Sequence, residues 1–169
     1  MARRRAVDIG GYVTRVRADP CFVCRIVRGE ATLPNPIVYE DDNTIAWVNP
    51  YQVLLGYTIV APKDHREQVT GDFTLADYLE LQRVLYRIGE AVRRAVPTER
   101  LYVLSLGSQQ GNRHVHWHVA PLPPGVAYEK QQLEALRLER GVLDLDDDEL
   151  AELAARIRVE LESPEESSR

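Results

Sequence analysis

The chain has 169 residues, enough for one globular domain with a hydrophobic core, and its 44% hydrophobic and 28% charged residues are ordinary for such a domain. Its formal net charge of −5 gives no reason to expect a nucleic-acid partner, and no apolar run approaches the ~20 residues that cross a bilayer. The basic N-terminus has no apolar segment behind it, so we expect no secretory signal, no membrane attachment and a cytoplasmic location.

The N-terminal segment is locally basic because it carries several arginines. We predict a flexible arm over residues 1–18, and contact of this arm with a polyanion is the alternative. Residues 19–162 are predicted to form a single domain, and residues 163–169 a polar tail.

Short strands are expected in the first half of the domain. Residues 21–29 favour a short helix or turn that carries both cysteines of the chain. Residues 37–40 and 44–48 are rich in β-branched and aromatic side chains and predict a hairpin. Residues 56–61 predict a third strand, which ends at Pro62.

The clearest helix is predicted over residues 75–96, between a capping pair at Thr74 and Asp77 and the helix-stopping Pro97. Its predicted apolar stripe recurs at three and four residues, with one glutamine as the exception: Leu75, Leu79, Gln82, Leu85, Ile88, Val92 and Val96.

Two more strands and two more helices complete the prediction. Residues 101–106 and 114–120 read as strands joined by the small, polar loop 107–112. Residues 129–140 and 146–161 read as helices. Because most strands follow one another and one long helix is inserted between them, an antiparallel α+β fold fits better than repeated βαβ units.

The cysteines have the spacing of half a zinc site. Two residues between Cys21 and Cys24 allow both thiolates to reach one tetrahedral ion, and His65 and His114 are candidates for the other half. A redox pair is one alternative, although the βαβ context typical of it is missing, and two unreactive thiols are the other.

Three histidines stand at alternate positions in the predicted strand 114–120. Alternation places His114, His116 and His118 on one face, with imidazoles roughly 6–7 Å apart, and leaves valines and a tryptophan for the core. A metal hydrolase using all three histidines is one interpretation, but no Asp or His follows closely to complete a ligand set. We favour a nucleophilic middle histidine that attacks phosphorus, with loop 107–112 offering backbone N–H groups to a phosphate.

This pattern resembles a known family. His-x-His-x-His at 114–118, followed by two apolar residues, resembles the signature of the histidine-triad (HIT) superfamily. Asn49-Pro50 and the later segment 56–65, which ends in Pro-Lys-Asp-His, resemble the family's strand ending in Pro-Lys-x-His. The Cys-x-x-Cys pair is similar to that of the zinc-binding subset. The resemblance covers roughly residues 19–125.

The resemblance implies a fold, an assembly and a reaction. It implies an α+β HIT-like fold with a five-stranded antiparallel sheet and one long helix, beyond which this chain has additional C-terminal helices. It also implies a homodimer that binds a nucleotide and attacks its α-phosphorus to form a covalent nucleotidyl-histidine. Dinucleoside polyphosphates and nucleoside phosphoramidates are the implied substrate classes.

Site residues carry over by position. His116 matches the nucleophile, and His118 matches the histidine that contacts the phosphate or leaving group. Asn49 matches the residue that binds the ribose hydroxyls, and Gln110 a polar loop residue near the phosphates. The zinc-binding subset implies a structural Zn²⁺ site of four protein ligands, with no open position for water: Cys21, Cys24, His65 and His114.

The chain departs from the family pattern in two places. Relatives often have Ser or Thr directly after the loop glutamine, where this chain has Gly111, and Ser105 or Ser108 are candidates to supply the hydroxyl. Relatives often have a basic residue where this chain has Leu122. These changes motivate a second hypothesis, a nucleotide-binding regulatory protein with little turnover.

Overall fold

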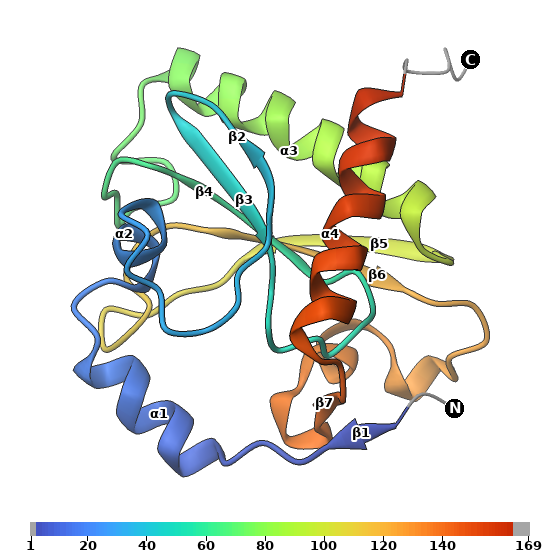
Figure 1. Ribbon diagram of the computed structural model, residues 1–169. Helices are drawn as coiled ribbons and strands as arrows, with labels where there is room; N and C mark the ends of the chain where they lie inside the picture. Colours follow the sequence, from blue (N-terminus) through green and yellow to red (C-terminus); the bar gives the residue numbers. More distant parts are fainter. Residues whose placement is uncertain (1–2, 164–169) are drawn as a thin grey trace.

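The computed structural model describes residues 3–163, so the predicted tail 163–169 lies outside the described part except for its first residue. Figure 1 shows a central sheet with helices packed around it. Among residues 3–163, no helix has the length and apolar character that crossing a bilayer requires.

The central sheet has five antiparallel strands in the order β2-β3-β4-β6-β5. They span Ile37–Glu40 (β2), Thr44–Val48 (β3), Thr58–Pro62 (β4), Arg100–Ser105 (β5) and Trp117–Leu122 (β6). The predicted α+β class and five-stranded sheet are therefore confirmed.

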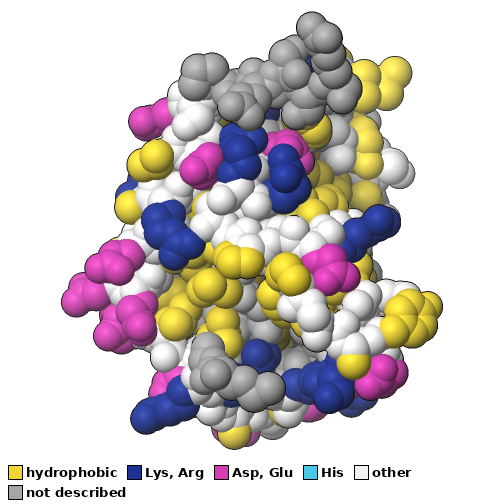
Figure 2. All heavy atoms as spheres, turned by 90° about the vertical axis from the view of Figure 1, so that its right-hand side faces the viewer, with side chains coloured by type: hydrophobic (Ala, Val, Ile, Leu, Met, Phe, Trp, Pro, Cys, Tyr) yellow, Lys and Arg dark blue, Asp and Glu magenta, His cyan; other side chains and the backbone are white. Residues whose placement is uncertain are grey.

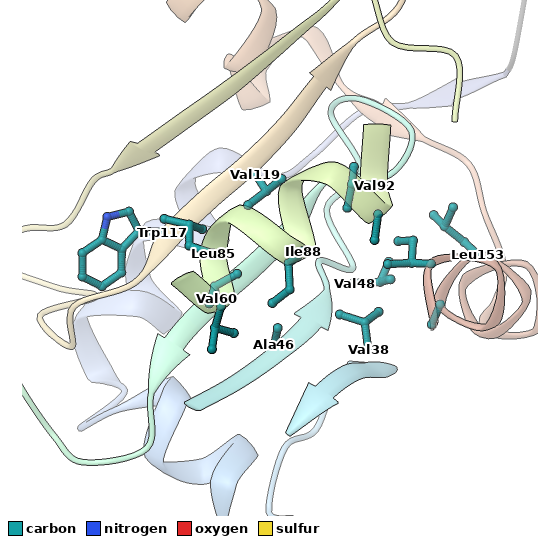
Figure 3. Packing of buried hydrophobic residues seen from close by; sticks show 14 of the residues in the cluster. Val38, Ala46, Val48, Val60, Leu85, Ile88, Val92, Trp117, Val119 and Leu153 are labelled. Carbon is teal, nitrogen blue, oxygen red and sulfur yellow. The ribbon is translucent and has the colours of Figure 1, made fainter. Parts of the chain in front are cut away.

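Helices α3 (Leu75–Ala95) and α4 (Asp147–Glu162) cover one face of the sheet. Side chains of both helices interdigitate with those of the strands, as Figure 3 shows for Ile88 and Leu153. Thr74 caps α3 as predicted, through a hydrogen bond from the backbone N–H of Asp77. A reciprocal capping box between Asp146 and Glu149 begins α4.

The predicted stripe of α3 is wrong in its first half. Leu75 and Leu79 are 74% and 56% exposed. The helix instead turns a face of i, i+3, i+4 spacing toward the sheet, beginning at Leu81 and continuing through Leu85 and Val92. Leu75 and Leu79 lie on a different side of the helix and do not belong to this cluster.

The opposite face of the sheet is covered by the short helix α2 (Phe22–Val27). Val23 packs there against Trp47 of β3 and Ile59 of β4, which are register partners. This layer is apolar and fixes α2, and with it both cysteines, beside the strands that lead to the histidines.

The N-terminal residues differ from the predicted flexible arm. Arg4–Arg5 form a short strand, β1, paired with β7 (Val142–Leu143), and Ile9–Ala18 form helix α1. Asp8 caps α1 by accepting a hydrogen bond from the Gly11 N–H. Because the pairing partner lies about 140 residues away in the chain, local sequence gave no signal for this strand.

The predicted helix over 129–140 is also corrected. The segment forms three short 3₁₀ turns: Tyr128–Lys130, Gln132–Leu136 and Leu138–Arg140. Gln132 has a φ of 56°, which an α-helix interior does not contain, and its N–H donates to the Tyr102 hydroxyl rather than along a helix.

Figure 2 views the side of the molecule that carries α4 and the end of α3. Apolar patches there are surrounded by charged side chains, and no histidine is visible among the coloured atoms. The triad histidines lie on the sheet face that α2 covers, where His116 packs against Phe22.

Candidate functional site

The histidine segment is only partly a strand. Strand β6 begins at Trp117, because the Val115 N–H donates to the Arg66 carbonyl instead of pairing with β4. The predicted alternation is still present, since Val115, Trp117 and Val119 all belong to the core under α3. The ring centroids of His116 and His118 lie 4.8 Å apart, closer than regular strand spacing predicts.

Four residues form a cluster with metal-ligand geometry: Cys21, Cys24, His65 and His114, whose ligand atoms all lie within 4.8 Å of one another. The Nδ1 atom of His114 lies 3.3 Å from Cys21 Sγ and 3.7 Å from Cys24 Sγ, and Nδ1 of His65 lies 3.5 Å from Cys24 Sγ. Two ligands of a tetrahedral zinc, one sulfur and one nitrogen, stand about 3.6 Å apart.

Both histidines of this cluster present a lone pair to its centre. Nε2 of His114 donates to the Pro62 carbonyl at 2.9 Å, and Nε2 of His65 lies 3.1 Å from the Glu67 carboxylate. Because these oxygens only accept, each Nε2 carries the proton and each Nδ1 is free to bind a cation. The residues therefore fit a bound metal ion.

Burial in this cluster disfavours charge. It raises the pKa of the Cys21 thiol to about 11 and lowers the pKa of His114 to about 4. A neutral imidazole is the form that binds metal, and a cation at the centre would favour the thiolate.

His116 points into a separate space beside this cluster. Its ring is 3% exposed and packs edge-on against Phe22, with centroids 5.2 Å apart. Nδ1 lies 2.7 Å from the His114 carbonyl oxygen, which only accepts, so Nδ1 carries the proton. Burial lowers the pKa of His116, and in the neutral ring Nε2 holds an unshared electron pair.

His118 is held by a tyrosine that sequence reasoning missed. The Tyr57 hydroxyl lies 2.6 Å from Nδ1 of His118, and the two rings are stacked at 17°. We assign the hydroxyl as the donor, which places the proton of His118 on Nε2. That atom is buried without a hydrogen-bond partner among the described residues. Burial lowers the pKa of His118 to about 4, and the nearby Leu106 carbonyl opposes this decrease.

His116 and His118 line a pocket of about 260 Å³. One wall is apolar and includes Phe22, Trp47 and Ile59, while Asn49 contributes a polar group. A mostly apolar pocket with a few convergent polar groups is typical of small-molecule sites.

The predicted site residues are only partly brought together. Gln110 does not line this pocket; it lies at a neighbouring cavity of about 20 Å³, where its side chain accepts from Arg17 at 3.4 Å. The N–H groups of Gln110 and Gly111 both bond to Ser108, so these two are not free to cradle a phosphate. Asn112, with a φ of 55°, reaches the larger pocket instead.

The two departures from the family pattern have structural explanations. Leu122 is fully buried in the core around Tyr57, so it does not reach the pocket. The Ser105 hydroxyl donates to the His116 carbonyl at 2.8 Å and supports the histidine segment rather than a ligand.

Comparison with curated proteins finds relatives with significant sequence similarity. No protein-family model matches the chain. A Bacillus subtilis (strain 168) protein named "Protein hit" is 30% identical over 109 residues, which are 62% of this chain and 72% of that protein. An uncharacterized HIT-like protein of Mycobacterium tuberculosis is 32% identical over 104 residues, 60% of this chain and 71% of that protein.

Solved structures share the fold. A hypothetical histidine triad nucleotide-binding protein from Sulfolobus tokodaii has a TM-score of 0.67 at 25% identity, covering 84% of this chain and 92% of its own. A Zn-bound histidine triad family protein from Mycobacterium smegmatis has a TM-score of 0.64 at 24% identity, covering 84% of this chain and 93% of its own.

Proposed function

This chain belongs to the histidine-triad (HIT) family, and we propose that it is a nucleotide hydrolase or nucleotidyltransferase that acts at the α-phosphorus of a nucleoside 5′-phosphate conjugate. One observation carries the proposal. The His114 carbonyl holds Nδ1 of His116, which leaves the Nε2 electron pair free in a pocket lined by aromatic and polar groups.

In the first step, the Nε2 electron pair of His116 forms a bond to the α-phosphorus. The bond from phosphorus to the leaving group breaks, and its electron pair stays with the leaving atom. The ring becomes a positively charged phosphoryl-imidazolium, and its Nδ1–H bond to the His114 carbonyl stabilises that charge.

In the second step, water or another acceptor attacks the same phosphorus. The bond between phosphorus and Nε2 breaks, its electron pair returns to His116, and one proton of the attacking water passes to solvent. The products of hydrolysis are a nucleoside 5′-monophosphate and the leaving group. Dividing one displacement into two is the advantage of a covalent intermediate.

We assign the remaining roles as follows. The Nε2–H of His118 donates a hydrogen bond to an oxygen of the phosphate or leaving group, since the described protein gives this buried donor no partner. Asn49, at the pocket wall, binds the ribose hydroxyls. Gln110 would contact phosphates only after its loop moves, because it lies outside the pocket.

We further propose that Cys21, Cys24, His65 and His114 bind a structural Zn²⁺. Four protein ligands leave no open position for a catalytic water. The ion would join α2 to the histidine segment and hold His114, whose carbonyl orients His116. Both cysteines are free of disulfides and available as ligands. We also propose a cytoplasmic location, whose reducing conditions keep such thiols reduced.

A homodimer is also part of this proposal. Strand β5 is an edge of the sheet, and Val103 on it is 48% exposed. Leu75, Leu79 and Tyr86, spaced by four and seven residues on α3, are also exposed. An unpaired sheet edge and an exposed row of apolar side chains on a helix are each surfaces that a second copy can cover. Light scattering at several concentrations tests this: a monomeric mass throughout would contradict it.

The enzymatic proposal is tested by turnover of the variant His116→Ala. A panel of dinucleoside polyphosphates and nucleoside phosphoramidates, with adenine and guanine bases, supplies the substrates. We expect the variant to lose several orders of magnitude of turnover, as loss of a covalent nucleophile usually causes. Near-normal turnover by His116→Ala would contradict the mechanism.

A nucleotide-binding regulatory protein is the second candidate. The observation that favours it is the loop, whose Gln110 and Gly111 N–H groups are bonded to Ser108 rather than free for phosphate. This candidate predicts tight nucleotide binding by the unmodified protein without turnover of any conjugate in the panel. Efficient turnover of one conjugate excludes it.

A further inference from the structure

Helix α1 forms part of the pocket wall, although it lies before the segment that carries the family motifs. Tyr12 and Arg15 of this helix line the pocket. The helix is fixed at its N-terminal side by the pairing of β1 with β7 and by Arg4, whose guanidinium donates to the carbonyls of Val53 and Gly141. Figure 1 shows α1 and β1 running along one side of the molecule.

The C-terminal part of α1 presses against the loop before the histidines. A Cβ atom added to Gly111 would lie 2.6 Å from Cγ1 of Val16, closer than Cβ atoms normally come, so Val16 or the loop would have to shift. A glycine at residue 111 is consistent with this close approach of α1. Helix α1 occupies the space that a side chain at residue 111 would need, and it brings arginines close to this loop.

Arg15 carries a positive charge that the described protein leaves without a carboxylate partner. Its Nη2 lies 3.4 Å from the Tyr51 hydroxyl, and no carboxylate of residues 3–163 lies within ion-pair distance of it. The acidic residue of the pocket, Asp19, is bound to Arg25 at 2.9 Å and accepts from the Cys21 N–H. A Cβ atom added to Gly11 would lie 2.3 Å from Oδ2 of Asp8 and 3.3 Å from Nη1 of Arg15, so Asp8 lies near Arg15 without forming an ion pair with it. The guanidinium at the pocket is therefore available to a ligand anion.

This cation lines the same pocket as His118. Tyr51, which Arg15 contacts, packs edge-on against Tyr12 with centroids 5.4 Å apart. Tyr12 is near enough to Tyr57 to affect its ionisation, and Tyr57 holds His118. Because Arg15 and His118 line the same pocket, a leaving group bound there can contact both side chains.

The hydrogen bond from Tyr57 limits what His118 can do for that leaving group. With Nδ1 already accepting from the hydroxyl, a neutral His118 has only its Nε2 proton, and giving it up would leave an imidazolate. His118 is therefore suited to donate a hydrogen bond and unsuited to transfer a proton. An amine needs a proton to depart, whereas a phosphate departs as an anion.

We propose that α1 is a specificity element, and that Arg15 recognises a negatively charged phosphoryl leaving group beyond the α-phosphate. This inference rests on the proposed function and deepens it. It names nucleoside polyphosphates and dinucleoside polyphosphates as the preferred substrate class over phosphoramidates. Guanidinium groups suit this role because they bind phosphate oxygens in a bidentate manner.

The test compares two substrates in two variants. Diadenosine tetraphosphate releases an anionic nucleotide, and adenosine 5′-phosphoramidate releases ammonia, which like an amine needs a proton to depart. We expect the unmodified protein to prefer the first substrate in kcat/KM. Arg15→Gln should lower kcat/KM for it by about tenfold to a hundredfold, the usual effect of losing a charged hydrogen bond, and change the second by less than about threefold.

The control is Arg137→Gln, which removes an exposed arginine that pairs with Glu134 and does not line the pocket. It should match the unmodified protein on both substrates. Arg15→Lys should recover only part of the loss, because lysine keeps the charge without the planar fork.

Different experimental results would refute the role of Arg15 and the proposed function. If His116→Ala abolishes turnover but Arg15→Gln affects both substrates equally or neither, the function stands and the role of Arg15 is refuted. Preference for the phosphoramidate by the unmodified protein refutes it as well.

If no substrate is turned over, a binding measurement tests the role of Arg15. We expect the unmodified protein to bind ATP at least about tenfold more tightly than AMP, and Arg15→Gln to lose that difference. Equal affinities of the unmodified protein for ATP and AMP would overturn the inference. So would an unchanged preference for ATP in Arg15→Gln.

Discussion

The Tyr57 hydroxyl lies 2.6 Å from Nδ1 of His118, and this contact connects the residue just before strand β4 to the last histidine of the triad. Tyr57 is 8% exposed, and burial raises the pKa of its hydroxyl, so it stays protonated as a donor. The bond determines which nitrogen of His118 carries its proton. Tyr57 is thus a positioning residue for the site.

Removing this hydroxyl should impair the chemical step more than binding. For Tyr57→Phe we expect kcat to fall about tenfold or more with a small change in KM, because the tautomer of His118 is no longer fixed. Nitrogen NMR of the imidazole should show the loss of the single tautomer. Tyr128→Phe, at a 76% exposed tyrosine, is the control. A single unchanged tautomer in Tyr57→Phe would refute this role.

Stability should decrease in mild acid because His118 is buried neutral. Its pKa is about 4 in the folded protein and 6.5 when exposed, so the unfolded chain binds the proton more tightly between these values. The stabilisation is fully present above pH 6.5 and is lost as pH falls toward 4, by at most about 3 kcal/mol. His116 on the same segment and Tyr57 are the titratable groups that face this ring.

Urea unfolding at pH 7 and pH 5 measures this dependence. We expect His118→Gln to show a smaller difference between the two pH values than the unmodified protein. Both proteins keep the Cys21 and His114 cluster, so acid effects on that cluster cancel in the comparison. Equal pH dependence in the two proteins would show that His118 does not contribute.

Removal of the proposed zinc should destabilise the whole domain. Structural zinc sites contribute on the order of 10 kcal/mol of apparent binding energy, so a strong chelator should lower the melting temperature by many degrees. Elemental analysis should find one zinc per chain in the unmodified protein and none in Cys21→Ser. If the metal is lost without any change in melting temperature, the ion is not structural.

The contact between Val16 and Gly111 should appear as coupling between two substitutions. Gly111→Ser adds a Cβ where Val16 lies, and we expect a loss of about 1–3 kcal/mol of stability from overpacking. Val16→Ala should recover much of that loss in the double variant, which a double-mutant cycle measures. Strictly additive effects would show that α1 does not press on the loop.

Local sequence patterns predicted much of the fold. The hairpin of β2 and β3 lies at the expected residues, because β-branched runs and an Asp-Asp-Asn turn are local signals. Helix α3 ends within one residue of its prediction, before Pro97. The 3₁₀ turns after residue 128 were missed because a left-handed residue, Gln132, breaks an otherwise helical pattern.

The part of the site that the sequence predicted is the metal cluster, because ligand spacing along the chain follows from the geometry of a bound ion. The cysteine pair and its two histidines come together as expected, since two intervening residues let both sulfurs face one centre. Tyr57 and Arg15 were missed because neither belongs to a local pattern. Their roles come from contacts between distant segments, which only tertiary structure creates.

The central claim is a transient bond between Nε2 of His116 and a nucleotide's phosphorus. Rapid alkaline quenching during turnover, followed by peptide mass spectrometry, tests it directly, because a phosphorus–nitrogen bond survives alkali better than acid. We expect one nucleoside monophosphate added to the peptide that contains His116, and none in His116→Ala. An adduct on another side chain, or turnover without any adduct, would contradict the mechanism.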